Sequence, residues 1–370
     1  MKKIFFNIPY KIKNLKKFNN LKTYAGNGIW TKKIQNRLSK KYSFKKVLLT
    51  DSCTSALEIA ALSLKLKSND EVIIPSYAYP TTASSFLRCG YKIKFVDCNE
   101  NDPKINKQHF IRQLNKKTKA VVIVHHAGQP EDLDFFLSLK KKYKFKLIED
   151  AAQCIDLRIG KKYLGSIGDF GCISFHESKN IHCGLGGALI INNKKFNNLS
   201  HHIWERGTNR KDFDKNTVKK YTWTEIGSNF YPTEFQANYL YNQLANISLV
   251  QKKRKKIFQL YVDNLKSLIE EKKIVGMNLN LKTNYHMHYI LMKDLQERER
   301  LKNYLEKKNI VSVSHYEPLH LSKIGKKFTK RKFKNTKNFS ERILRLPIHT
   351  ELSKKQILFI CKSIKSFFRI

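Results

Sequence analysis

The feature that most constrains the fold is a regular alternation of short apolar runs and helical patterns between about residues 47 and 193. Helical patterns at 55–66, 132–143 and 195–204 separate or follow the apolar runs. The runs that read as strands are 47–49, 71–74, 92–96, 120–124, 146–149, 172–175 and 188–191. Such alternation is typical of parallel βαβ architecture. We therefore expect an α/β fold with a large domain built on one seven-stranded, mostly parallel sheet.

The pattern changes near Val250, where long charged helices replace the alternation. The segments expected beyond this point are helices at 251–271, 297–308 and 353–368, strands at 289–292 and 310–315, and a Lys-rich loop at 323–338. This composition indicates a smaller α+β domain. The expected division is a large domain over residues 1–248 and a small C-terminal domain over residues 249–370, which suits a chain of 370 residues.

Composition and the N-terminal sequence indicate where such a protein works. The N-terminus loses its apolar character at Asn7 to Pro9, so no signal-peptide core follows, and no stretch reaches the roughly 20 apolar residues of a membrane span. The seven cysteines are scattered and contain no CxxC pair, which argues against disulfides and against a zinc site. We expect a cytoplasmic protein with reduced thiols, no metal and no membrane partner.

The formal net charge of +42 allows two interpretations. A basic surface can bind nucleic acid, but such proteins gather their cations on one face or in a recognisable motif. Here the lysines are spread along the chain, together with many Asn, Ile, Phe and Tyr residues that share A/T-rich codons. Compositional drift explains the charge better, so we expect no nucleic-acid partner. Weak attraction of anionic substrates stays open.

Two strands end in residues suited to cofactor chemistry. In open α/β sheets ligands gather at the carboxyl ends of the strands. Asp150 ends one apolar run, with Gln153 shortly after it, and a carboxylate there can hold a cationic ring nitrogen. Lys179 follows another run and can form a Schiff base once its ammonium loses a proton. The alternatives are that Asp150 caps a following helix and that Lys179 is one more surface lysine.

Two further segments suit a phosphate and a close backbone approach. Residues 49–57 pass from a strand into an apolar helix through small hydroxyl residues, and free amides at a helix N-terminus hold phosphate. Plain capping by Ser52 or Thr54 is the alternative. The Gly-rich turn 183–187 allows close approach or is only structural. Taken together, a Schiff-base lysine, a ring-nitrogen carboxylate and a phosphate seat describe a pyridoxal phosphate (PLP) site.

At these residues the chain resembles the sugar nucleotide aminotransferase family, whose members share the type I PLP fold of aspartate aminotransferase. The motifs that carry the resemblance, in order along nearly the whole chain, are residues 52–57, 75–79, 149–153, 174–180 and 227–230. A related group that removes a sugar hydroxyl has histidine at the position of Lys179. The lysine therefore favours amino transfer.

The resemblance implies roles for four residues around the cofactor ring. Lys179 matches the lysine that carries PLP and acts as the catalytic residue. Asp150 matches the aspartate that pairs with the pyridine nitrogen, and Gln153 matches the glutamine near the ring hydroxyl. Tyr79 occupies the position whose aromatic ring stacks on PLP.

The resemblance also implies a phosphate seat and a subunit arrangement. Cys53, Thr54 and Ser174 match the residues that hold the cofactor phosphate. Asn229 matches a residue that reaches the phosphate of the partner subunit's cofactor. The resemblance therefore implies a homodimer with shared active sites.

The segments 206–210, 220–223 and 315–320 look most like the branch that makes dTDP-4-amino-4,6-dideoxygalactose for lipopolysaccharide or enterobacterial common antigen. The implied reaction moves an amino group from L-glutamate to the C4 keto group of a dTDP-4-keto-6-deoxyhexose. Arg206, Arg210 and His320 are the candidate substrate residues, since cations suit the nucleotide diphosphate. Amination of another nucleotide keto sugar, at C3 for example, and a catalytically silent basic binding protein are the alternatives.

One motif departs from the family. The usual Gly-Glu-Gly-Gly reads Gly184-Leu185-Gly186-Gly187 here, so a carboxylate near the site is replaced by Leu185. This change bears on how the amino donor is handled.

Overall fold

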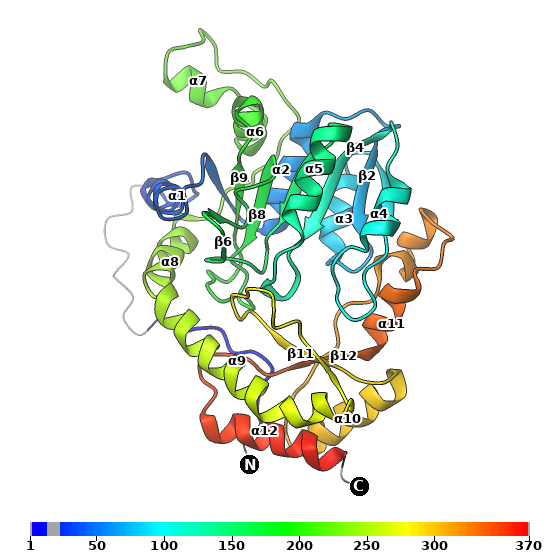
Figure 1. Cartoon of the computed structure of the whole chain (residues 1–370). Coiled ribbons are helices and arrows are strands. Elements are labelled where there is room, and N and C mark those ends of the chain that lie inside the picture. Colours follow the sequence, from blue (N-terminus) through cyan, green and yellow to red (C-terminus); the bar gives the residue numbers. More distant parts are fainter. Residues whose placement is uncertain (1, 13–22, 369–370) are drawn as a thin grey trace.

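A seven-stranded sheet forms the centre of the computed structural model, which describes residues 2–12 and 23–368 (Figure 1). Its strands are β1 (Val47–Thr50), β2 (Glu71–Pro75), β3 (Lys92–Val96), β4 (Thr118–Val124), β5 (Lys146–Asp150), β8 (Phe170–Ser174) and β9 (Gly187–Ile191). They lie in the order β1-β9-β8-β5-β4-β2-β3, and β9 pairs antiparallel with both of its neighbours. The other pairings are parallel. The seven expected strands and the mostly parallel sheet are confirmed.

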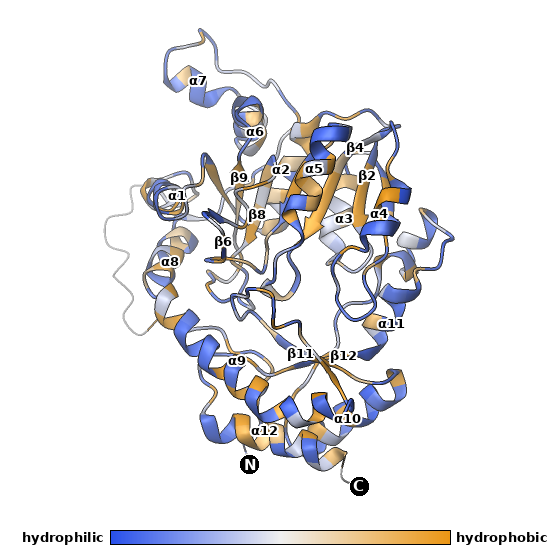
Figure 2. Ribbon diagram, viewed as in Figure 1, coloured by the Kyte–Doolittle hydropathy of each residue, from blue (hydrophilic) through white to orange (hydrophobic). Residues whose placement is uncertain are grey.

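Helices cover both faces of this sheet because its strands are apolar on both sides. The helices of the large sheet are α1 (Ile29–Tyr42), α2 (Cys53–Leu64), α3 (Pro80–Leu87), α4 (Lys107–Gln113), α5 (Leu133–Tyr143), α6 (Asn197–Trp204), α7 (Arg210–Asp214) and α8 (Glu234–Ala245). Alternate residues of one strand enter different cores: Val47 and Leu49 pack with α1 and α8, whereas Leu48 packs with α2 and α6. Figure 2 shows the strands as the most hydrophobic segments.

The C-terminal part has its own core on a small antiparallel sheet of order β10-β11-β12. Its elements are α9 (Ile247–Glu270), β10 (Val275–Gly276), β11 (His288–Leu291), α10 (Leu295–Lys307), α11 (Lys334–Arg342), β12 (Ile343–Leu346) and α12 (Lys354–Phe367). Ile4, from the other end of the chain, is buried in this core and forms a bridge with Ile310. Within the described ranges, no helix has both the length and the apolar character needed to cross a membrane.

Two expectations for the C-terminal part were wrong. The strand expected at 310–315 is absent; Ile310 bridges Ile4 and Val313 bridges Arg345 of β12, so the segment changes partner and forms no continuous ladder. The Lys-rich segment 323–338 is not all loop, since it contains a 3-10 turn at Gly325–Lys327 and the first residues of α11. Thr336 lies on the buried face of α11. This face is not evident in the sequence because lysines surround it.

Candidate active site

The carboxyl ends of the parallel strands face the small sheet (Figure 1). β5 ends at Asp150 and β8 ends at Ser174, and these two strands pair directly with each other. The short 3-10 turn His126–Gly128 follows β4 at the same edge. The sheet therefore brings three loops together at the place where open α/β sheets bind their ligands.

Lys179 lies in the loop after β8, where its backbone N–H donates to the carbonyl of His176 at 2.9 Å. Burial lowers the pKa of Lys179 below its ordinary value; Cys53 and Asp150 oppose this shift, and the cation of Arg345 adds to it. Its Nζ makes no hydrogen bond or ion pair with another residue that the structure describes. A lysine amine in such surroundings loses its proton more readily and can act as a nucleophile.

Asp150 is buried, with a fractional exposure of 5%, and both of its carboxylate oxygens are held. Thr82 Oγ1 donates to Oδ2 at 2.7 Å, and the N–H of Ala152 donates to Oδ1 at 3.1 Å. Burial raises the pKa of Asp150, while these two hydrogen bonds and the charge of Lys179 act against the rise. The carboxylate is therefore fixed in orientation and suited to a cationic partner.

The helix expected after Asp150 is absent. Residues 151–157 form turns, so Asp150 does not act as a helix cap. The Asp150 side chain accepts instead from the backbone two residues on, which is the local bond that Asp makes in turns. The capping interpretation of this carboxylate was therefore wrong.

Gln153 and Tyr79 both approach Tyr316, a residue from the C-terminal part. Gln153 Oε1 accepts from the N–H of Ala127 at 2.7 Å, and its Nε2 donates to Tyr316 Oη at 3.3 Å. The rings of Tyr79 and Tyr316 meet edge to face with centroids 5.8 Å apart. Tyr79 is 56% exposed at the start of α3, so its ring is available for contact with a ligand.

The N-terminus of α2 and the end of β8 lie against each other through Gly187. Ser174 pairs with Gly187 across the sheet, and a Cβ on Gly187 would lie 2.4 Å from the backbone nitrogen of Cys53. Only glycine allows this approach. Ser52 caps α2 by accepting from the N–H of Ser55, as the capping alternative requires, and Cys53 and Thr54 form the first turn. Free amides of this first turn suit a phosphate.

The placement and the charges of these residues fit PLP. Lys179 supplies an amine with a lowered pKa, and Asp150 supplies a buried, oriented carboxylate whose charge reaches that amine. The first turn of α2 supplies a seat for an anion beside Ser174. A cofactor with an aldehyde, a basic ring nitrogen and a phosphate matches all three.

Four other candidate residues lie apart from Lys179 and Asp150 in their described contacts. Asn229 is exposed and forms a bridge with Glu205. Arg206 is exposed, and its guanidinium lies 4.8 Å from the ring of Tyr231. Their proposed roles stay predictions.

The remaining two candidates are engaged elsewhere within one chain. Arg210 pairs with Asp214 at 3.6 Å in the short helix α7, which lies at the far side of the large sheet from β11 and β12 (Figure 1). His320 is buried, and its Nδ1 lies 2.6 Å from Ser76 Oγ. The roles of Arg210 and His320 in substrate binding also stay predictions.

Sequence reasoning missed several residues of this site. Thr82, His126, Tyr316 and Arg345 come from four separate segments, and the structure brings them to the edge that carries Asp150 and Lys179. Thr82 follows the motif at 75–79 by one helical turn, which is the one local signal that marks it. Tyr316 lies in the segment 315–320 that the resemblance singles out, whereas His126 and Arg345 carry no such signal, because only tertiary contacts place them here.

Leu185 takes the place of the family's carboxylate on an open turn. Its side chain is 57% exposed, and its carbonyl accepts from Gln236 Nε2 at 3.0 Å. The turn is therefore held by its backbone, and a leucine side chain stands where the carboxylate is expected.

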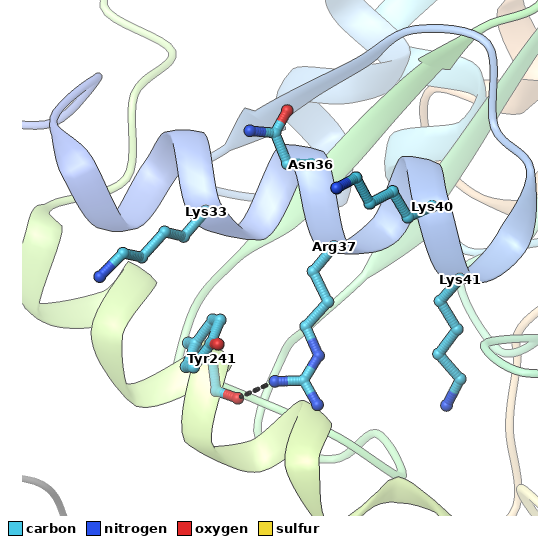
Figure 3. Close-up of a pocket in the computed structure, with 6 residues that line it drawn as sticks. All are labelled: Lys33, Asn36, Arg37, Lys40, Lys41 and Tyr241. Atoms are coloured by element: carbon cyan, nitrogen blue, oxygen red, sulfur yellow. Dashed lines mark hydrogen bonds between the residues drawn. The ribbon is translucent and has the colours of Figure 1, made fainter.

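Basic side chains also line a surface hollow of about 560 Å³ between α1 and α8. It is lined by Lys33, Asn36, Arg37, Lys40, Lys41 and Tyr241. In Figure 3, the Arg37 side chain extends from α1 towards α8 and donates to the backbone carbonyl of Tyr241 at 3.2 Å. None of the candidate cofactor or substrate residues lines this hollow.

Comparison with known proteins identifies the family. The model of the DegT/DnrJ/EryC1/StrS aminotransferase family matches residues 10–365. GDP-perosamine synthase of Escherichia coli O157:H7 is 27% identical, over 93% of this chain and 92% of that protein. A UDP-N-acetyl-3-dehydro-alpha-D-glucosamine 3-aminotransferase of Acidithiobacillus ferrooxidans is also 27% identical, over 85% of this chain and 82% of that protein.

A solved structure shares the whole fold. The sugar aminotransferase Spr1654 of Streptococcus pneumoniae, described as putative and solved in its PLP form, superimposes with a TM-score of 0.88 at 22% sequence identity. The match covers 100% of this chain and 99% of that chain. The chain thus belongs to the DegT/DnrJ/EryC1/StrS aminotransferase family and is a PLP-dependent sugar aminotransferase.

Proposed function

We propose that this enzyme transfers the amino group of L-glutamate to the C4 keto group of a dTDP-4-keto-6-deoxyhexose. The product is then dTDP-4-amino-4,6-dideoxygalactose, a precursor for cell-surface polysaccharide. The observation that carries the proposal is that Lys179, with its lowered pKa, and the buried Asp150 lie at the same edge of the sheet. The sugar itself is proposed from the resemblance of segments 206–210, 220–223 and 315–320.

Lys179 holds PLP and then serves as the base. When bound, the cofactor withdraws electrons from the carbon that loses its proton. Lys179 Nζ accepts the proton from Cα of L-glutamate, for which its lowered pKa prepares it. In the second half of the reaction the same Nζ delivers a proton to the sugar carbon that receives nitrogen. L-Glutamate leaves as 2-oxoglutarate before the keto sugar enters, so ping-pong kinetics are expected.

The neighbouring side chains orient this base and the ring. Asp150 would hold a proton on the pyridine nitrogen of the bound cofactor, and Thr82 fixes the carboxylate that would do so. Tyr79 would cover one face of the ring, and Gln153, anchored on Ala127, would lie near the ring hydroxyl. Preorganised groups of this kind stabilise charge as it develops.

A homodimer with shared active sites is part of the proposal. Exposed apolar side chains of the large domain support it, because a second copy would cover them. They include Tyr79, Leu185, Trp223 and Ile226, with fractional exposures of 56%, 57%, 74% and 73%. Asn229 lies in the same segment as Trp223 and Ile226 and would reach the partner's cofactor phosphate.

Amination at C3 of another nucleotide sugar is the second candidate. It is favoured by the relative from Acidithiobacillus ferrooxidans, whose name places the amino group at position 3. Product analysis by NMR after reaction with dTDP-4-keto-6-deoxyglucose decides between the two. A nitrogen-bearing C4 supports the proposal, and no turnover of this sugar contradicts it.

The first experiment is an absorbance spectrum of the protein with PLP, before and after L-glutamate. The wild type should show a visible Schiff-base band that glutamate bleaches, and Lys179→Ala should lack it. Lys162→Ala, which removes an exposed lysine away from this edge, is the control. A band that survives in Lys179→Ala would remove Lys179 from its role.

A further inference from the structure

Arg345 is a buried cation whose hydrogen-bonding groups are only partly used. It lies on β12 with a fractional exposure of 8% and forms no ion pair with any carboxylate in the described part of the chain. Its Nη1 donates to His315 Nδ1 at 2.7 Å, while its Nε has no partner there. A buried guanidinium without an anion is costly, so such a residue is expected to have a ligand.

Contacts link Arg345 to the candidate cofactor residues. His315, which accepts from Arg345, stacks on Tyr316 with ring centroids 5.4 Å apart. Tyr316 in turn accepts from Gln153 and packs against Tyr79. The guanidinium therefore lies behind the aromatic group that borders the ring site, and its charge helps to lower the pKa of Lys179.

His126 is a second buried group on this side whose polar atoms have no partner. Its fractional exposure is 4%, and neither ring nitrogen has a partner among the described residues. Its ring meets those of Tyr77 and Tyr316 edge to face, at 5.1 and 6.1 Å. Burial, together with Arg345 and Lys179, lowers the pKa of His126 to about 3, so the imidazole is neutral and offers one N–H donor.

We propose that Arg345 and His126 form the subsite for a carboxylate of the amino donor. The inference rests on the proposed function, because it requires an amino acid whose Cα reaches Lys179. Nε and Nη2 form one edge of the guanidinium, and two parallel N–H groups match the two oxygens of a planar carboxylate. The N–H of His126 adds a third donor.

A carboxylate fits this place better than the diphosphate of the sugar substrate. Arg345 is enclosed by aromatic rings: its guanidinium lies 4.6 Å from the ring of Phe6, and Tyr77 and Tyr316 lie close enough to act on its charge. A small planar anion needs little room in such surroundings. A diphosphate that carries a nucleoside needs an open route to solvent.

The first test is binding of glutarate, which has the carboxylates of the donor but no amine, to the PLP-bound protein. Calorimetry should show binding to the wild type that weakens roughly 10- to 100-fold in Arg345→Met, because a charge-assisted hydrogen bond is lost. His126→Phe should weaken binding by about 10-fold or less. Arg298→Met is the matched control, since Arg298 is equally buried but already donates to the Glu341 carbonyl and pairs with Glu299.

Thermal stability separates a ligand-binding role from a structural one. Arg345→Met removes an uncompensated buried cation, so the Tm of the ligand-free variant should equal or exceed that of the wild type. Glutarate should raise the Tm of the wild type but not that of Arg345→Met. A large fall in Tm of the ligand-free variant would show a structural arginine and overturn the proposal.

The two half-reactions provide the last test. The sugar carries no carboxylate at its reacting carbon, so Arg345→Met should slow the bleaching by L-glutamate much more than the half-reaction with the keto sugar, on which Arg345 acts only through the pKa of Lys179. Equal glutarate binding in wild type and variant, or weakened binding of dTDP in place of glutarate, would overturn the subsite. A wild type that binds glutarate through Arg345 but does not respond to L-glutamate would refute the proposed function and leave the subsite standing.

Discussion

Glu149 and His125 face each other at the end of adjacent strands, with Oε2 and Nε2 3.0 Å apart and both side chains fully buried. The carboxylate also accepts from the backbone N–H groups of Gly165, Ile167 and Gly168 at 2.6 to 2.8 Å. Burial acts to raise the pKa of Glu149, but His125 and these N–H groups outweigh it, so the pKa is lowered. This pair fixes the end of β5, where Asp150 is the next residue.

Replacing Glu149 should destabilise the fold. Glu149→Gln leaves the same shape but loses the charge that three backbone N–H groups and His125 hold, at a cost of roughly 3 kcal/mol in the free energy of unfolding. Urea denaturation of the wild type and the variant measures it. Glu306→Gln, on an exposed face of α10, should change stability by less than about 0.5 kcal/mol. Equal losses in both variants would contradict the role of the pair.

The same group gives the wild type a stability that depends on acid. Because the folded pKa of Glu149 lies below its unfolded value near 4.5, its contribution is complete above that value and is lost as the pH falls through the folded pKa. Denaturation midpoints measured below pH 5 should therefore fall more steeply with acid in the wild type than in Glu149→Gln. Parallel curves would show that Glu149 does not titrate in this range.

The rate at which PLP forms its visible band should follow the ionisation of Lys179. Only the unprotonated amine reacts, so the rate should rise with pH to a plateau. The midpoint of this rise should lie below pH 10.5, because the pKa of Lys179 is lowered from that value. Asp150→Asn removes an anion that raises the pKa of Lys179, and the midpoint should move to lower pH. Stopped-flow absorbance over a pH series measures both. A midpoint that moves upward in Asp150→Asn would contradict the arrangement.

Thr82 should matter for catalysis through Asp150. Thr82→Val removes the 2.7 Å hydrogen bond that opposes the rise in the pKa of Asp150, so that pKa should rise further. We expect kcat to fall by about 10-fold, since one hydrogen bond to a charged group is lost. The acidic limb of the pH profile should move to higher pH. Thr82→Ser should restore the wild-type profile, and Thr81→Val, at the neighbouring position, is the control. If the acidic limb of the pH profile does not move in Thr82→Val, Thr82 serves only in packing.

Gly187→Ala should weaken the phosphate seat. A Cβ at this position would lie 2.4 Å from the backbone nitrogen of Cys53, so β9 and the first turn of α2 must separate. We expect the Kd for PLP to rise by roughly 10-fold or more, at a cost typical of overpacking. Fluorescence titration with PLP measures it. Binding of wild-type strength would show that the first turn of α2 does not hold the phosphate.

The large sheet could be predicted from the sequence because its signal is local. Each strand is a short apolar run between turns, and alternate residues of a run such as 47–49 must enter opposite cores. Asp150 and Lys179 were selected as candidates in the same way, since the ends of parallel strands meet at one edge whatever the rest of the chain does. The local signal failed where a helix was expected after Asp150 and a strand at 310–315.

The rest of the site was decided by tertiary structure. Thr82 and Asp150 are 68 residues apart, and Gln153 and Tyr316 are 163 residues apart, yet each pair shares a hydrogen bond. In the sequence, nothing distinguishes Arg345 from the other lysines and arginines, and the chain has 72 of these residues in all. It becomes a candidate ligand-binding group only because β12 buries it without an anion beside the aromatic border of the site. The sequence by itself determined the sheet and the residues at its strand ends, since burial of apolar runs is a local requirement. Only the packing of the small sheet against that edge determined which distant cations and rings surround Lys179, because such contacts depend on how the whole chain fills space.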